Sequence, residues 1–256
     1  MSFVIENKFF PTVEGFKAYL KTLTFDAWRP SFVVQHNTSE PSLALYKEWK
    51  ARTPPTTLLQ YMTNMMPYYS GMGWNGGPHL FVAPDGIGVF NPLTKHGTHS
   101  PSWNRISWGV ECVGEFDTEP FQEPQKSLLI GALAALHELI GLDPATLRFH
   151  KEDPETTHKG CPGPDIGTKA SLIAAVQAVM TAAHPGEHDT KELFKLNQQR
   201  MTLRASPAGL HLQVIEDAIR TWCQEQTIHG YQLSGFVTEE QISSLALSII
   251  AKESTP

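Results

Sequence analysis

The hydrophobic pattern at the start of the chain predicts a helix followed by a strand. Phe16, Leu20 and Leu23 recur at helical spacing, and a β-rich run follows at residues 31–35. We therefore expect a helix that leads into a short buried strand ending at His36.

Two further helices and a hairpin are expected next. Residues 41–49 and 56–65 have helical patterns, and two adjacent prolines separate them. We interpret residues 67–77 as a loop rich in glycine and aromatic residues, whose Tyr68, Tyr69, Met72 and Trp74 would either contact a substrate or simply cover the core. The β-rich runs 80–83 and 87–90 are joined by Pro-Asp-Gly, which predicts a β-hairpin.

Two more strands are predicted downstream, each associated with a residue of chemical interest. Residues 106–113 alternate as a strand does, and this alternation places Glu111 on one definite face. Residues 146–149 form a short β-rich run that ends at His150. Strand ends are therefore expected to carry polar side chains here.

The most distinct helix is predicted at residues 125–140. Pro124 precedes it, Gly141 ends it, and its leucines and isoleucine form one apolar stripe. Another helix is expected at residues 168–182. The Pro-Gly pair at 185–186 follows it and is a natural domain boundary.

We accordingly expect a large domain at residues 1–185 and a small helical domain at residues 186–256. Amphipathic patterns at 210–223 and 239–250 support the second domain. Its helix, glycine-containing turn and second helix are loosely similar to small peptidoglycan-binding repeats. A packing or dimerisation appendage explains the same pattern equally well.

Composition narrows the class of protein. The chain has 256 residues, of which 41% are hydrophobic and 18% charged, as in globular proteins with a sizeable core. A net charge of −6 gives no basic footprint, so nucleic acid is not an expected partner. No apolar stretch approaches the roughly 20 residues needed for a membrane span. The first residues lack the pattern of a secretory signal, and three scattered cysteines do not form a disulfide framework.

Three residues form a candidate metal site. His36 and His150 each follow a predicted strand, and Cys161 lies in the loop Lys-Gly-Cys-Pro-Gly at 159–163. Two imidazoles and one thiolate suit zinc and leave a fourth position for water, which is typical of a catalytic site. A structural site would instead show paired short spacings.

A set of motifs carries a resemblance to a known family. They occur in one order along the chain, and they lie at residues 33–38, 77–82, 85–86, 107–111, 150–153 and 158–163. Together they resemble the zinc amidases that include phage amidase lysins, bacterial recycling amidases and peptidoglycan recognition proteins. The resemblance implies an α/β fold in which helices flank a mixed central β-sheet.

The resemblance also implies roles for individual residues. His36, His150 and Cys161 match the zinc ligands, Glu111 matches a general base and Lys159 matches a catalytic lysine. This agrees with the chemistry, since zinc lowers the pKa of bound water to about 7. Glu111 would then relay the proton, and Lys159 would stabilise the oxyanion.

Each assignment has an alternative. The less favoured alternatives are that Glu111 is only a strand carboxylate paired with Arg105 or Arg148, and that Lys159 is only a solvated loop charge. His158 stands three residues before Cys161, which is also metal-ligand spacing, so it is a reserve ligand.

Substrate contacts are expected from His99, His79, Trp74 and Asn37. His99 could instead be an exposed loop histidine, and His79 could simply pack. The sequence departs from many lysins at Pro78, where they carry a tyrosine that assists catalysis. This departure places more of the expected catalytic burden on Glu111.

The predicted function is hydrolysis of the bond between N-acetylmuramic acid and L-alanine by an N-acetylmuramoyl-L-alanine amidase. The alternative is a non-catalytic recognition protein of the same fold, although such relatives typically lose the cysteine that is present here at Cys161. Without a visible signal, we expect cytoplasmic synthesis, with action on the cell wall after release or on muropeptides in the cytoplasm.

Overall fold

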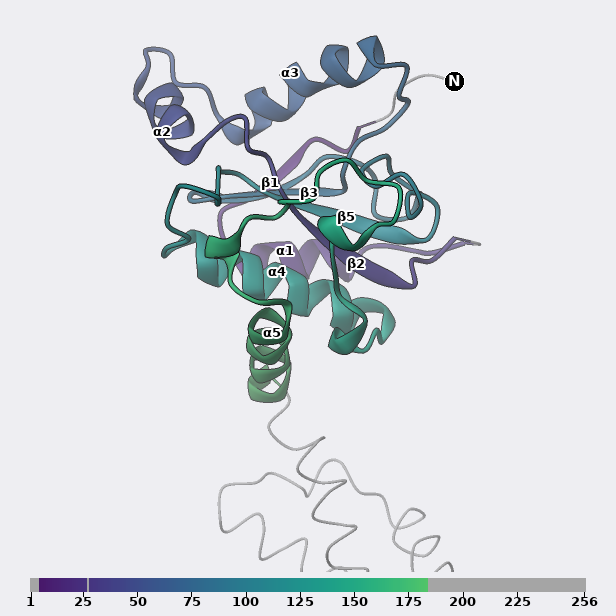
Figure 1. Ribbon diagram of the computed structural model, residues 1–256. Coiled ribbons are helices and arrows are strands. Elements are labelled where there is room, and N and C mark those ends of the chain that lie inside the picture. Colours follow the sequence, from purple (N-terminus) through teal and green to yellow (C-terminus); the bar gives the residue numbers. More distant parts are fainter. Residues whose placement is uncertain (1–4, 27, 184–256) are drawn as a thin grey trace, which may run out of the picture. The chain divides into compact units, whose positions relative to one another are not determined.

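A mixed six-stranded β-sheet forms the centre of the described part of the chain (Figure 1). The computed structural model describes residues 5–26 and 28–183. The strands are β1 (Lys8–Phe10), β2 (Phe32–Asn37), β3 (Leu80–Ala83), β4 (Gly86–Val89), β5 (Ser107–Cys112) and β6 (Arg148–Phe149). Their order across the sheet is β1-β4-β3-β5-β2-β6.

Parallel and antiparallel pairing divide the sheet into two parts. The strands β3, β5, β2 and β6 run parallel to one another, whereas β4 is antiparallel to both β3 and β1. The predicted fold class, an α/β fold with a mixed sheet, is therefore confirmed. The carboxyl ends of the parallel strands lie at one edge, where ligand sites commonly form in α/β proteins.

Five α-helices are present in the described part of the chain. They are α1 (Val13–Leu20), α2 (Leu43–Ala51), α3 (Leu58–Gly71), α4 (Gln125–Ile140) and α5 (Lys169–Ala183). Figure 1 shows α2 and α3 on one side of the sheet and α1 and α4 on the other. None of these helices is long and apolar enough to cross a membrane.

Side chains alternate between the two faces of the sheet, and each face contributes to a separate hydrophobic core. Val82, Val110 and Cys112 pack with α1 and α4, whereas Phe81 and Val113 pack with α2 and α3. The larger core lies beneath α4, which is buried along most of its length. The smaller core lies beneath α3 and borders the candidate site.

Helix α4 matches its predicted bounds, and its two ends explain why. Gly141 ends it in the left-handed conformation at φ 69°, which a glycine adopts without strain. At the other end, the buried Gln125 amide donates to the carbonyls of Val82 and Val113 at 2.9 and 2.7 Å. This side chain fastens the helix to the ends of β3 and β5.

Three expectations need correction. The predicted loop at 67–77 is helical as far as Gly71, because α3 continues through Pro67. The strand β1 was not anticipated. His36 lies inside β2, one residue before its end. The predicted hairpin is confirmed, while the predicted helical domain at 186–256 and its boundary lie outside the described residues.

Candidate metal centre

The register of the sheet places His36 and Glu111 side by side. His36 on β2 pairs with Glu111 on β5, and Glu111 pairs in turn with Phe81 on β3. On the other side of β2, Gln35 pairs with Phe149, so His150 follows at the level of His36. These residues share the face of the sheet that α3 covers.

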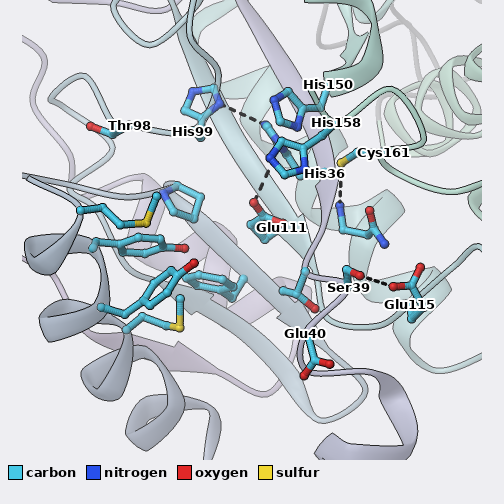
Figure 2. Close-up of a pocket in the computed structure, with 18 of the residues that line it drawn as sticks. His36, Ser39, Glu40, Thr98, His99, Glu111, Glu115, His150, His158 and Cys161 are labelled. Carbon is cyan, nitrogen blue, oxygen red and sulfur yellow. Dashed lines mark hydrogen bonds and ion pairs between the residues drawn. The ribbon is translucent and has the colours of Figure 1, made fainter. Parts of the chain in front are cut away.

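Three potential ligand atoms converge at this edge of the sheet. His36, His150 and Cys161 each offer one atom, and these atoms lie within 4.8 Å of one another. Figure 2 shows the two imidazoles and the thiol grouped above Glu111. Because both histidines are buried and the thiol is half-buried, the cluster is shielded without being closed.

Each potential ligand is held by a contact away from the cluster. The Nε2 atom of His36 lies 3.1 Å from Nδ1 of His99, and Nε2 of His150 lies 2.9 Å from Oγ1 of Thr156. Both histidines therefore keep Nδ1 as the nitrogen without a hydrogen bond, which suits a metal ligand. The backbone N–H of Asn37 donates to Sγ of Cys161 at 3.4 Å.

The electrostatics favour neutral imidazoles. Burial, together with the neighbouring histidines, holds the pKa of His36 well below its usual range. Burial and His158 lower the pKa of His150 to about 4. Neutral histidine is the form that binds metals, so this donor set fits a zinc ion.

The thiol and the carboxyl group also favour their uncharged forms. Burial and the nearby Glu111 raise the pKa of Cys161. Burial raises the pKa of Glu111 to about 8. One carboxyl oxygen lies 3.8 Å from Nδ1 of His36, and the other is buried without a hydrogen-bond partner. A cation bound beside these groups would offset the cost of ionising them.

An open groove of about 700 Å³ leads to this cluster. One side, here called the aromatic wall, comes from α3 and the loop after it, and it consists of Tyr61, Met65, Tyr68, Tyr69, Met72 and Trp74. Trp74 stacks on Tyr69 with ring centroids 5.3 Å apart. On the other side of Glu111 lie Glu40 and Glu115 (Figure 2), and Asp117 also lines the groove.

Comparison with known families identifies the chain. The sequence profile of the family described as N-acetylmuramoyl-L-alanine amidase matches residues 26–164, which is more than half of the chain. The chain belongs to this amidase family. The predicted family is thus confirmed, and the amidase match covers every member of the metal cluster.

Several solved structures are similar to this amidase-family chain. The endolysin amidase LysCS from Clostridium intestinale URNW is 22% identical, with a TM-score of 0.46 over 59% of this chain and 85% of that one. Drosophila PGRP-LB is 23% identical, with a TM-score of 0.43 over 57% and 82%. The Ph2119 endolysin from a Thermus scotoductus bacteriophage is 20% identical, with a TM-score of 0.40 over 60% and 88%. No curated protein matches the chain.

The amidase groove includes some of the predicted substrate contacts. Asn37, Trp74 and His99 line it, as does Pro78 at the position of the family tyrosine. His158 also lines the groove. Its ring stacks on His150 with centroids 5.5 Å apart, but it is not a member of the ligand cluster.

Two predicted residues are not among those that line the groove. His79 is fully buried, accepts from the N–H of Gly109 at 3.0 Å and contacts the carbonyl of Lys95 at 2.9 Å. It therefore packs inside the protein, as the alternative interpretation had it. The amine of Lys159 donates to the carbonyl of Asp153 at 3.0 Å.

Sequence reasoning missed Thr156, and in the aromatic wall it missed Tyr61 and Met65. A signal for the wall was present, because Tyr61, Met65, Tyr68 and Met72 follow one another at spacings of four, three and four. That is one helical face. The assumption that the helix ended at Met65 concealed it.

Proposed function

We propose that the chain is a zinc-dependent N-acetylmuramoyl-L-alanine amidase that cleaves peptidoglycan between N-acetylmuramic acid and L-alanine. Family membership supports amidase activity in general. The observation that carries the finer proposal is the grouping of His36, His150 and Cys161 beside Glu111 at the end of an open groove.

The four residues divide the chemistry between them. Two imidazoles and a thiolate would hold zinc, which when bound supplies a water with a pKa of about 7 and polarises the scissile carbonyl. Glu111 would take a proton from the attacking water and deliver it to the amine of the leaving L-alanine. Its position beside His36 and its raised pKa support this role, since a base that returns its proton needs a pKa near the working pH.

The groove would hold the substrate on both sides of the reacting bond. Its aromatic wall offers flat apolar surfaces for the faces of sugar rings, and Asn37 offers a polar side chain near the proposed ligands. Lys159 would stabilise the developing oxyanion, which requires its amine to leave the carbonyl of Asp153. The proposed role of Lys159 is therefore the one that most needs a direct test.

The test measures zinc content and the release of L-alanine amino termini from purified peptidoglycan, with and without a chelator. The wild-type chain should contain one zinc ion, and it should no longer release L-alanine amino termini when the metal is removed. Cys161→Ala should lose both zinc and release. Cys112→Ala is the matched control, because Cys112 is a fully buried thiol in the core beneath α4.

The outcomes separate this proposal from its alternatives. Zinc binding without release would favour a non-catalytic recognition protein, and a chain without zinc would overturn the metal centre. Comparing intact peptidoglycan with soluble muropeptides as substrates would then distinguish a lysin from a recycling enzyme.

A further inference from the structure

We propose that His99 is a positioning residue whose hydrogen bond fixes which nitrogen of His36 is presented to the metal. The inference rests on the zinc site proposed above. It assigns a role to His99, which contacts the proposed ligand His36 but does not itself bind the metal. Figure 2 shows the contact as a dashed line between the two rings. His99 contacts the ligand on the side away from Glu111.

The contact between the two histidines is well formed. Nδ1 of His99 and Nε2 of His36 are 3.1 Å apart, and both rings are buried. The rings meet edge to face, with centroids 5.1 Å apart and an angle of 88° between their planes. Within this geometry, only one nitrogen of His36 remains for the metal.

The direction of the hydrogen bond between His36 and His99 follows from the partner of the other ring nitrogen of His99. Nε2 of His99 lies 3.3 Å from the carbonyl oxygen of Ser107, which can only accept. The hydroxyl of Ser107 donates to the carbonyl of Trp103 at 2.8 Å, so towards His99 it also accepts. Nε2 of His99 therefore carries a proton.

This proton settles the tautomers of both rings. In a neutral imidazole one nitrogen donates and the other accepts, so Nδ1 of His99 accepts from Nε2–H of His36. Nδ1 of His36 is then the nitrogen with the free lone pair. It is also the nitrogen that lies 3.8 Å from Glu111, inside the groove.

The fold holds the ring of His99 tightly in place. A Cβ atom on Gly109 would lie 2.4 Å from Cγ of His99, so the ring occupies the space that a side chain at 109 would need. The side-chain oxygen of Asn104 accepts from the backbone N–H groups of His99 and Ser100 at 2.6 and 2.7 Å. Both features fix the loop that carries His99.

The experiment compares zinc affinity, measured by competition with a chromophoric chelator, in the full chain and two variants. His99→Leu removes the acceptor and should weaken zinc binding about 10- to 100-fold. His99→Asn places an amide oxygen close to the position of Nδ1 and should restore most of the affinity. His137→Leu is the control, because it removes another buried histidine, which contacts the carbonyl of Leu133 in α4.

A second measurement needs no substitution. Nitrogen-15 NMR of the histidine side chains in the zinc-loaded chain should show His36 protonated at Nε2. Gly109→Ala should disturb this signal and weaken zinc binding, because it displaces the ring without removing it.

The experiment distinguishes failure of the proposed zinc site from failure of the proposed role of His99. A wild-type chain without zinc would overturn the metal site and this role together. A wild-type chain that binds zinc, with a His99→Leu variant that binds it equally well, would overturn the role of His99 alone. A change in KM without a change in zinc affinity would instead make His99 a substrate contact.

Discussion

At the scale of single residues, burial moves the three proposed ligands and Glu111 towards their uncharged forms. It lowers the pKa of His36 and His150 and raises the pKa of Glu111 and Cys161. The two neutral histidines are ready to bind a metal, whereas the thiol must lose its proton. Metal uptake should therefore release protons from both Cys161 and Glu111.

The base assignment predicts a separation of binding from turnover. Glu111→Gln keeps the shape of the side chain and removes its basicity, so zinc content should be unchanged while turnover falls about 10²- to 10⁴-fold. The measurement is release of L-alanine amino termini at saturating zinc. Glu138→Gln on α4, where the carboxylate pairs with Lys17, is the control. A fully active Glu111→Gln enzyme would end this assignment.

The role of Lys159 gives a second prediction at this scale. Lys159→Met should retain zinc and lower turnover about 10²-fold or more, because it removes the cation proposed to stabilise the oxyanion. Lys169→Met is the control, since this lysine pairs with Glu152 at the start of α5. Equal rates for the two variants would leave the amine of Lys159 as a loop contact to Asp153.

At the scale of elements, the sequence predicted the helices and strands that have long or regular hydrophobic patterns. Helix α4 has a complete apolar stripe and clear ends, and the turn of the β3–β4 hairpin has distinctive chemistry. By contrast, β1 is three residues long and is defined mainly by pairing with β4. Sheet order was out of reach because pairing partners are set by packing between distant segments.

Part of the candidate site could likewise be proposed from the sequence, and part could not. The proposed ligands fall in short motifs with distinctive residue types, so His36, His150 and Cys161 could be named from the sequence. Thr156 could not, because a threonine that supports a ligand looks like any other loop threonine. The assignment of Glu111 to one face of β5 followed directly from alternation along the strand.

Helix α2 carries a pH-dependent contact at its start. The carboxylate of Glu119 accepts from the N–H groups of Leu43, Ala44 and Glu115 at 2.6 to 2.9 Å. Partial burial raises the pKa of Glu119, but these hydrogen bonds outweigh it and the pKa is lowered. A lowered carboxyl pKa stabilises the fold above the unfolded value of about 4.3, and this contribution is lost as pH falls through the folded value.

Glu119→Gln should therefore lower the free energy of unfolding by about 0.5–2 kcal/mol at pH 7, as loss of a helix cap does. The difference from wild type should shrink as the pH falls below about 4. Urea denaturation at several pH values measures both effects. A difference that stays constant across this range would contradict the contact.

At the scale of the whole molecule, the proposed metal would join segments that are far apart in sequence. His36 belongs to β2, while His150 and Cys161 follow the short edge strand β6. Only two residue pairs join β6 to β2. Zinc would therefore reinforce the sheet where its own hydrogen bonds are fewest.

This predicts a thermal stability that depends on zinc. Zinc at 100 times its dissociation constant should stabilise the folded chain by about 2.7 kcal/mol, because it binds the folded state. Scanning calorimetry with and without a chelator measures the shift in Tm. Cys161→Ala should show no shift, whereas Cys112→Ala should behave like wild type. A Tm unaffected by chelation in the wild-type chain would contradict a metal bridge.

The aromatic wall and the metal ligands belong to different stretches of the chain. Residues 61–74 form the wall, while the ligands lie at positions 36, 150 and 161. A gene can therefore alter the two independently. If the proposed metal centre holds, one codon change at Cys161 would remove a ligand and leave the wall intact, so a single mutation would separate cleavage from binding in the groove.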